Sequence, residues 1–371
     1  MTEIGKLLPA VGDVSRIERI LDLARWAPSG DNSQPWTFEI IDGRQVTIHG
    51  SDTRQHCVYD LDGRPSQMSI GALLETAAIA ASAQGLAMRA SRRINLPESS
   101  PTFDLYFDPD AEVRRSVLFD VIASRSVQRR SFSTQPLSVE HKALLHASLG
   151  PSLSVRWLEG VRARLAAASL LFRSARLRLI TPEAYRVHRH VIEWGARFSE
   201  DRVPDQALGV GRAMLAMMRF GMHSWERVHF LNRFLAGTWA PRLLMDARPA
   251  VACAAHFVLL AEHPPASIDQ NVQAGRELQR FWLTATRLGL MMQPELTPLI
   301  FSRYAREGRH FSVVAGADDA ARNVAARMAK LAGEECLTHG AFFGRIGYAP
   351  TPVARSLRKP LESLLIRRTN S

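Results

Sequence analysis

The chain has 371 residues, of which 46% are hydrophobic, and it carries a formal net charge of +11 at pH 7. This length and apolar content can bury a large core, in one large domain or two ordinary ones, which excludes a disordered or fibrous chain. Apolar stretches such as residues 249–261 fall short of the roughly 18 residues that cross a bilayer, so we expect no membrane partner. The N-terminus lacks the order of a secretion signal, and we therefore expect a cytoplasmic protein.

Cysteine and histidine usage argues against two kinds of site. Cys57, Cys253 and Cys336 are far apart, odd in number and without C-x-x-C spacing, so neither a disulfide framework nor a zinc site is indicated. His188 and His190 stand two positions apart, and such residues point to different faces of a helix. We therefore predict no metal site.

The positive charge favours an anionic partner. The arginines are spread through helical segments, with the densest stretch at residues 162–178, and no known nucleic-acid-binding module occurs. We expect no nucleic-acid partner, since that alternative requires a steeply salt-dependent affinity for DNA or RNA. Some of the arginines are available for an anionic cofactor instead.

The chain opens with signals for a helix and a hairpin. Ser15 and Glu18 form a capping box ahead of helically spaced apolar residues, and Pro28 ends that helix. Two strand-like stretches, residues 36–41 and 45–49, flank an Asp-Gly-Arg turn. This arrangement predicts a β-hairpin.

A second helix and a strand follow. Residues 71–86 are small and apolar almost all round, which predicts a helix in the middle of a core or a subunit-like interface. Residues 102–107 predict a strand, followed by a helix that ends near Ser124. A new helix is predicted after Ser138, which is its cap, with Glu140 in the first turn.

The rest of the chain is mostly helical. Residues 165–244 predict long helices rich in Arg, His, Met and Trp, and the apolar run at 249–261 is typical of a central strand. A long helix is predicted over 272–290 and a strand over 342–348. No fixed-period repeat is evident.

Residues 27–36, with the sequence APSGDNSQPW, are the most informative segment. A proline that stops a helix precedes short hydrogen-bonding side chains and a Gln-Pro-Trp that leads into a strand. Such a segment presents polar groups from a fixed loop, which suits recognition of a flat, heteroatom-rich ring. It resembles the A-P-S-x-x-N-x-Q-P-W segment of the nitroreductase family of FMN-dependent oxidoreductases. The resemblance implies that Pro28, Ser29, Asn32 and Gln34 contact the flavin.

A basic segment at residues 125–132, RSVQRRSF, resembles the family's R-x-S-x-R-x-F motif with one additional residue. A flavin phosphate requires Arg or Lys together with hydroxyl and backbone donors. The resemblance implies that Arg125, Ser126 and Arg129 bind this phosphate. The additional residue leaves open whether Arg129 or Arg130 takes the second basic position, and a basic surface turn is the structural alternative.

Two later segments add to the resemblance. Residues 275–294 resemble the family's buried helix near the dimer core, G-x-x-x-Q-x-x-x-L-x-A-x-x-x-G-L. Residues 345–350 and 358–362 resemble the C-terminal I-G-Y-P and R-x-P-L-E of the same family. The resemblance implies that Arg358 closes on the flavin phosphate.

The order of these segments predicts the organisation. The family normally opens with the arginine motif, so this chain carries about 120 residues ahead of the usual start. The resemblance implies an α+β fold, a mainly antiparallel sheet flanked by helices, built as an internal pseudo-dimer. Residues 1–120 form one nitroreductase-like half with the APSGDNSQPW loop, and residues 121–371 form the other, with a helical insertion at about 165–244. A monomer of this kind and a homodimer are both left open.

The resemblance implies an FMN-binding oxidoreductase that passes a hydride from NADH or NADPH through the flavin to a small acceptor, such as a nitroaromatic or a quinone. The flavin carries the chemistry, so the sequence requires no catalytic acid or base. The alternative is a flavin-sequestering or sensory protein with little turnover, in which residues 165–244 form a lid. Trp225, Phe230, Phe234 and Trp239 are the apolar residues available there to shield the ring.

Overall fold

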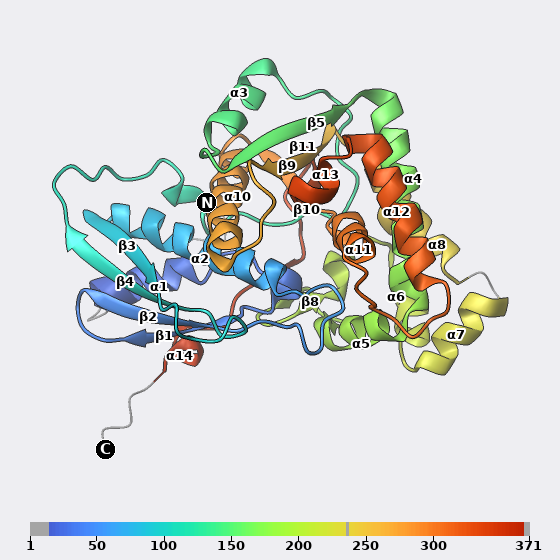
Figure 1. The fold of residues 1–371 in the computed structure, drawn as a ribbon, viewed down its shortest axis with the longest axis horizontal. Helices are drawn as coiled ribbons and strands as arrows, with labels where there is room; N and C mark the ends of the chain where they lie inside the picture. The colour runs from blue at the N-terminus through green and yellow to red at the C-terminus, as the bar shows by residue number, and fades with distance from the viewer. Residues whose placement is uncertain (1–14, 235–236, 367–371) are drawn as a thin grey trace.

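The chain folds around two four-stranded antiparallel sheets, as seen in a computed structural model that describes residues 15–234 and 237–366. The strand order is β1-β2-β4-β3 in the first sheet and β10-β11-β9-β5 in the second. Helices pack on both sheets, so the predicted mixture of helices with mainly antiparallel sheets is confirmed (Figure 1). The prediction that the N-terminus lacks a secretion signal concerns residues 1–14, which lie outside the described residues.

The first unit has the predicted helix and hairpin. Its capping box is confirmed, because the Glu18 amide donates to Ser15 Oγ at 3.2 Å and the Ser15 amide donates to Glu18 Oε2 at 2.8 Å. The second helix begins at Arg64 rather than near residue 71, since Gly63 and Pro65 start it before the apolar run. The elements are α1 (Arg16–Ala24), β1 (Trp36–Ile40), β2 (Gln45–Gly50), α2 (Arg64–Ser82), β3 (Leu86–Arg92) and β4 (Thr102–Pro109).

The second unit is larger and more deeply buried. Strand β9 lies between β11 and β5, and six of its seven residues are buried, as expected for a central strand. It begins at Ala255 rather than at residue 249, because the preceding residues form a short helix. Its elements are α3 (Val139–Ala147), β5 (Leu153–Glu159), β9 (Ala255–Ala261), α10 (Ile268–Arg287), β10 (Leu290–Pro294), α11 (Thr297–Arg306), α12 (Ala317–Ala332), α13 (Cys336–His339) and β11 (Gly340–Tyr348).

The two units share one topology. The series β1, β2, α2, β3, β4 corresponds in chain order and strand pairing to the series β5, β9, α10, β10, β11. The connections differ. Residues 41–44 join β1 to β2, whereas residues 160–254 lie between β5 and β9. Most of the additional length of the second unit therefore enters at the position of a hairpin turn.

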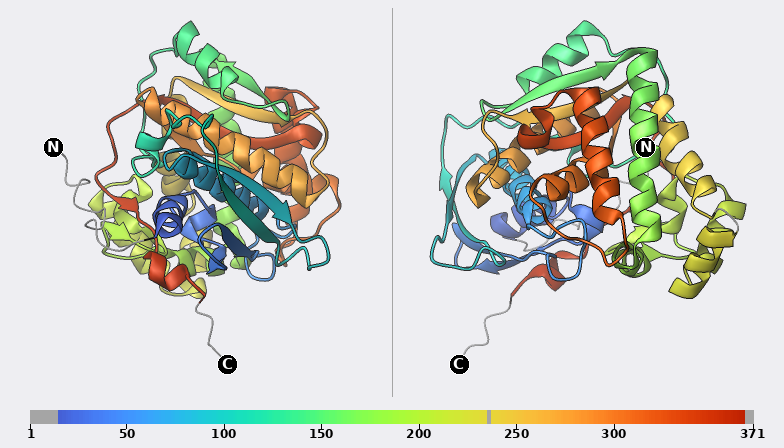
Figure 2. Two further views of the ribbon diagram at one scale, coloured as in Figure 1. Left: turned by 90° about the vertical axis from the view of Figure 1, so that its left-hand side faces the viewer. Right: turned by 45° about the vertical axis from the view of Figure 1, so that its right-hand side comes forward.

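Helices α2 and α10 pack directly against each other between the sheets (Figure 2). A Cβ added at Gly71 would lie 1.9 Å from the Val272 carbonyl oxygen, and one added at Gly275 would lie 2.0 Å from that of Met68. Each glycine faces the residue three positions before the other, so the contact is reciprocal. The backbones approach so closely that only glycine fits at either position.

The long connection between β5 and β9 is helical, as predicted, but it also contains three very short strands. One of them, β7, pairs in parallel with β12 (Arg355–Ser356) of the C-terminal tail. Its elements are α4 (Gly160–Ile180), α5 (Pro182–Val191), β6 (Ile192–Glu193), β7 (Phe198–Ser199), β8 (Val203–Pro204), α6 (Arg212–Gly221), α7 (Trp225–Phe234), α8 (Trp239–Pro241) and α9 (Arg248–Val251). Beyond β12, α14 (Leu361–Leu364) returns to the first unit, where the Ile366 amide donates to the Phe38 carbonyl at 2.8 Å.

The prediction of a helix that ends near Ser124 is wrong. The segment contains only a short 3₁₀ turn, Phe119–Val121, and its apolar residues Leu118 and Ile122 pack against Ile79 and Leu283. Tertiary packing, rather than a helical period, decides this conformation. Within the described residues, no helix has both the length and the apolar character that crossing a membrane requires.

Candidate functional site

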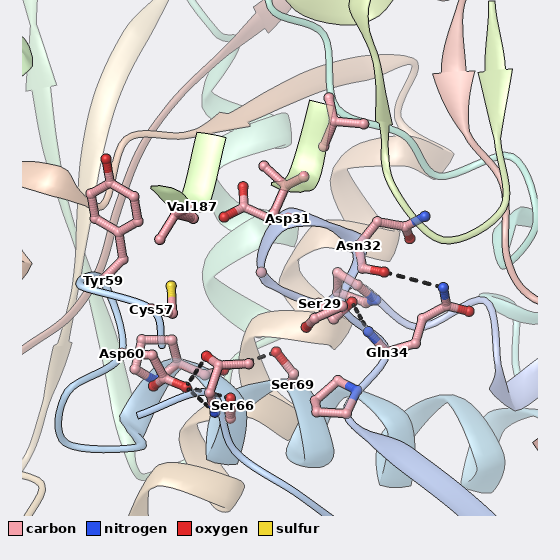
Figure 3. A pocket seen from close by; sticks show the side chains of 18 of the residues that line it. Ser29, Asp31, Asn32, Gln34, Cys57, Tyr59, Asp60, Ser66, Ser69 and Val187 are labelled. Carbon is pink, nitrogen blue, oxygen red and sulfur yellow. Dashed lines mark hydrogen bonds between the residues drawn. The ribbon is translucent and has the colours of Figure 1, made fainter. Parts of the chain in front are cut away.

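A cavity of about 1700 Å³ is lined by both units. Its wall includes residues 28–37 and 49–61, the beginning of α2, the arginine segment near residue 125, α5, α10 and the C-terminal tail (Figure 3). Small-molecule sites usually have volumes of roughly 300–1,000 Å³. The cavity therefore has room for a cofactor together with a second small molecule.

The loop before β1 has an unusual backbone. Asp31, Asn32 and Gln34 have φ angles of 49°, 63° and 48°, and no other non-glycine residue of the described chain has a positive φ. Asn and Asp tolerate this left-handed conformation better than Gln does. The Gln34 amide donates to Ser29 Oγ at 2.9 Å, which helps to hold the turn closed. Such strain concentrates at binding sites, where the surrounding structure maintains it.

The side chains of Asn32 and Gln34 join this loop to two distant segments. Asn32 Nδ2 donates to the carbonyls of Glu200 and Arg202 at 3.1 and 3.2 Å, and Gln34 Nε2 donates to Glu200 at 2.8 Å. In the tail, Arg358 Nη1 donates to Asn32 Oδ1 at 2.8 Å, and the backbone amide that follows Arg358 donates to Gln34 Oε1. We call this set of hydrogen bonds the amide clamp. Through the clamp, the side-chain amides of Asn32 and Gln34 hold the segments of the cavity wall in position.

Three arginines cluster beside the cavity, and none of them pairs with a carboxylate of the described residues. Arg125 and Arg358 are buried, and Arg355 is half-buried. Their guanidinium groups donate to backbone carbonyls such as those of Trp26 and Ala27, and to the Asn32 amide. Burial, together with the neighbouring Arg358 and Arg355, holds the pKa of Arg125 well below its ordinary value. Burial, Arg355 and Arg25 lower the pKa of Arg358 to about 9.

This cluster has a clear electrostatic consequence. Arginine stays protonated in proteins, and uncompensated buried charge is costly. Nε of Arg125 is buried and has no hydrogen-bond partner. The cluster therefore has the composition of an anion site that can take a multiply charged group such as a phosphate.

The remaining part of the arginine segment is held from behind. Arg129 lines the cavity and donates to the Ala207 carbonyl at 3.3 Å, whereas Arg130 is exposed and does not line it. Arg345 donates to the carbonyls of both residues at 2.8 and 3.0 Å. Arg345 is paired in turn with Glu295 at 3.1 Å. The geometry thus places Arg129, and not Arg130, at the cavity.

Further hydrogen-bonding side chains line the cavity. Tyr59 Oη lies 3.0 Å from His188 Nε2, and burial and Arg178 lower the pKa of His188 to about 3, so this imidazole is neutral. Asp31 makes no side-chain hydrogen bond or ion pair within the described residues. Its carboxylate is accessible from inside the cavity. The surrounding protein raises the pKa of Asp31 through burial, and this effect outweighs the lowering by Arg129 and Arg178. In the view of Figure 3, Val187 lies between Tyr59 and Asp31.

Apolar side chains and one free amide oxygen complete the wall. Met68 comes from α2 and Leu278 and Trp282 come from α10, and all three line the cavity. The ring centroid of Trp282 lies 4.7 Å from the guanidinium carbon of Arg125. Gln293 also lines the cavity, and its buried Oε1 accepts no hydrogen bond from residues 15–234 or 237–366. This part of the cavity combines apolar cover with an unused acceptor.

The structure brings the eight residues selected from the sequence to one cavity, although they come from the first loop, the middle of the chain and the tail. Their role in cofactor binding stays a prediction. Sequence reasoning missed Arg355, Asp31, Tyr59 and His188. Asp31 occupies a variable position of the recognised motif, and nothing local to Tyr59 or His188 predicts that they meet. The eight are Pro28, Ser29, Asn32, Gln34, Arg125, Ser126, Arg129 and Arg358.

The sequence interpretation predicted the wrong residues to shield a flavin ring. Trp225, Phe230, Phe234 and Trp239 do not line the cavity, and the last three are exposed. Helix α5 lines it instead, through residues such as Val187 and His188. The apolar composition of the connection could not show which of its helices turns inward. Within the described residues, no group of three or more His, Cys, Asp or Glu side chains could hold a metal ion.

No family model matches the sequence, and no curated protein matches it. Among solved structures, a nitroreductase-like family protein from Bacillus cereus aligns with 12% sequence identity and a TM-score of 0.35. The alignment covers 70% of this chain and 100% of the other. A nitroreductase-like protein is thus a structural neighbour of this mixed α and β chain.

Proposed function

We propose that the protein binds FMN and acts as an oxidoreductase of the nitroreductase type. The observation that carries this proposal is the cluster of Arg125, Arg355 and Arg358, which adjoins a cavity large enough for a flavin and pairs with no carboxylate in the part of the chain that the structure describes. A phosphate dianion would compensate this charge. Arg129 and the Ser126 hydroxyl line the same cavity.

The rest of the cavity supports the proposal. Met68, Leu278 and Trp282 offer apolar cover for a ring face, and Gln293 Oε1 is an unused acceptor for a ring-edge N–H. Ser29 and the loop of residues 28–34 would meet the polar edge of the ring. When bound, the flavin would supply hydride transfer from NADH or NADPH to a small acceptor such as a nitroaromatic or a quinone. The space beside Asp31, Tyr59 and His188 would take that acceptor.

We also propose that the chain is an internal pseudo-dimer. The repeated topology of the two units and the reciprocal contact of Gly71 and Gly275 support this arrangement. In such an arrangement the first unit supplies the loop at residues 28–34 and the second unit supplies the arginine segment. The long connection at residues 160–254 would then be an insertion into the second half.

The alternative function is flavin sequestration or sensing with little turnover. Two observations favour it. Helix α5 forms part of the cavity wall, and the amide clamp attaches residues 200 and 202 of the same connection to the loop at residues 28–34. Both features restrict access to the cavity.

The absorption spectrum of freshly purified protein, before and after incubation with FMN and desalting, tests cofactor binding. We expect a flavin spectrum that is retained on desalting. The variant R125A/R358A should bind FMN at least about tenfold more weakly, since each charge-assisted hydrogen bond contributes roughly 1.5–3 kcal/mol. The control R303A removes an arginine that pairs with Asp62, and neither of these two residues lines the cavity, so the variant should retain FMN. A protein that stays colourless, or a double variant that binds like the wild type, contradicts the proposal.

Steady-state oxidation of NADH or NADPH by the FMN-loaded protein separates the two functions. Turnover with a quinone or nitroaromatic acceptor supports the oxidoreductase. An absence of turnover, together with slow reduction of the flavin by dithionite, supports the sequestering protein.

A further inference from the structure

Helices α6 and α7 carry aromatic side chains that the described part of the chain leaves largely exposed. None of the residues of α7 is buried, and in α6 only Gly221 is buried. Phe220, Phe230 and Phe234 are 59%, 54% and 64% exposed. The rings of Phe230 and Phe234 lie 5.0 Å apart between their centroids, so these two residues share one patch. Figure 2 shows the pair of helices at the periphery of the molecule.

Arginines accompany these aromatic side chains. The guanidinium carbon of Arg227 lies 4.7 Å from the ring centroid of Phe220, and that of Arg233 lies 5.6 Å from the centroid of Phe234. Arg212 and Arg219 add two further positive charges, and Glu226 is the single acidic residue of the two helices. Within the described residues, none of these four arginines forms an ion pair.

The inner side of the two helices is fixed to the protein. Tyr185 Oη donates to the Met222 carbonyl at 3.3 Å, and Asn232 Nδ2 donates to the Leu179 carbonyl at 2.7 Å. The rings of Tyr185 and Trp225 also lie 5.5 Å apart between their centroids. The exposed face is therefore presented in a defined orientation.

We propose that this face docks on an anionic phospholipid surface. The docking face consists of Phe220, Phe230 and Phe234 together with Arg212, Arg219, Arg227 and Arg233. Phe and Trp side chains insert at the boundary between headgroups and acyl chains, and arginines pair with lipid phosphates. Charge complementarity selects this occupant over a second copy of the chain, because a two-fold contact through the same face would bring like-charged arginines together.

The proposal concerns a surface that is separate from the cavity. None of the docking-face residues lines the cavity. The expectation of no membrane partner rested on the absence of a spanning segment, and peripheral docking requires no such segment. The interaction is independent of the proposed flavin chemistry.

Sedimentation with vesicles tests the proposal. The full-length protein should sediment with vesicles of phosphatidylcholine and phosphatidylglycerol at low salt, and it should stay in the supernatant with phosphatidylcholine alone. High salt should reduce the binding, because screening weakens the pairing of arginine with phosphate. Failure to sediment with the anionic vesicles overturns the proposal.

A matched pair of variants locates the surface. F220S/F230S/F234S should weaken vesicle binding by roughly tenfold or more, since it removes three large apolar side chains from the inserted face. The control V139S/V313S/V353S changes three residues of 75%, 80% and 70% exposure elsewhere, and it should bind like the wild type. Circular dichroism of each variant checks the fold. Equal binding by both variants contradicts the proposal, as does a dimer of the wild type in light scattering that the first variant abolishes.

Discussion

The two units have the same strand order and pairing, but they contribute different chemistry to the cavity. The first unit contributes a strained loop in which Asp31, Asn32 and Gln34 have positive φ angles. The second unit contributes the arginine segment at residues 125–129, which Arg345 holds in place. One framework thus carries either a recognition loop or an anion site, depending on the segments attached to it.

The units also differ in how their sheets are covered. Strand β9 of the second unit is buried almost throughout, with α10 on one face and α4, α11 and α12 on the other. In the first unit, the corresponding strand β2 has four of its six residues buried, and the core residues of its neighbour β4, Phe103, Leu105 and Phe107, alternate along the strand, as in a sheet with one covered face. The first unit is therefore more dependent on α2, and through it on the second unit, for its stability.

The contact between α2 and α10 is the first place to test this comparison. Gly71→Ala and Gly275→Ala should each lower the free energy of unfolding by about 3 kcal/mol, because the added methyl group would overlap a backbone carbonyl of the other helix. Chemical denaturation measures both values. If the contact is reciprocal, the two losses are similar. Gly43→Ala, where the added Cβ meets nothing within 4 Å, is the control and should change little.

The amide clamp is the second place to test the comparison of the two units. Asn32→Ala should lower the free energy of unfolding by about 2 kcal/mol. The substitution removes the donor to the Glu200 and Arg202 carbonyls and the side-chain oxygen that accepts from Arg358 Nη1. Thermal or chemical unfolding measures the loss. Asn323→Ala changes an exposed amide and should cost less than about 0.5 kcal/mol. Equal losses in the two variants would show that the clamp does not hold the units together.

The corresponding strands β9 and β2 each carry a histidine, one buried and one partly exposed. We expect the buried one to make a smaller, pH-dependent contribution to the free energy of unfolding. In the second unit, both ring nitrogens of His256 face acceptors, Glu295 Oε2 and the Ala250 carbonyl, each at 2.8 Å. Burial acts to lower the pKa of His256, but Glu295 outweighs it and raises the pKa to about 10. In the first unit, His49 pairs with Glu39 at 3.0 Å and is partly exposed.

The direction of this effect follows from the raised pKa. The stabilisation from protonated His256 is fully present below the ordinary pKa of 6.5 and is lost as the pH rises through about 10. The destabilisation caused by His256→Gln should therefore shrink between pH 6.5 and 9, by at most about 1.4 kcal/mol per pH unit. Denaturation at several pH values measures it. His49→Gln is the control and should cost less than about 1 kcal/mol. A pH-independent cost at His256 would contradict a protonated ring.

Local signals in the sequence predicted most of the framework. The capping box at Ser15, the hairpin after Trp36 and the apolar run before Glu262 each depend on neighbouring residues, and each is confirmed in the structure. The segment before Ser124 failed because Leu118 and Ile122 are placed by contacts with distant residues. Local periodicity contains no information on such contacts.

The order of the family-like segments predicted two nitroreductase-like halves, but the individual residues that recur between the halves were not recognised. Gly71, Leu74, Ala81, Gly85 and Leu86 recur with the same spacing as Gly275, Leu278, Ala285, Gly289 and Leu290. A comparison of the chain with itself, rather than a search for a short period, would have found this signal. The cavity residues missed by the prediction, such as Tyr59 and His188, belong to segments that meet only in the folded chain.

The repeated topology within one chain has a genetic consequence. In an assembly of two identical subunits, every substitution appears twice and changes two equivalent clefts at once. Here each codon specifies a single position, so the segments on either side of the α2 and α10 contact can diverge independently. One side is thus able to specialise in ligand recognition while the other loses it, without any change in the helices that join them.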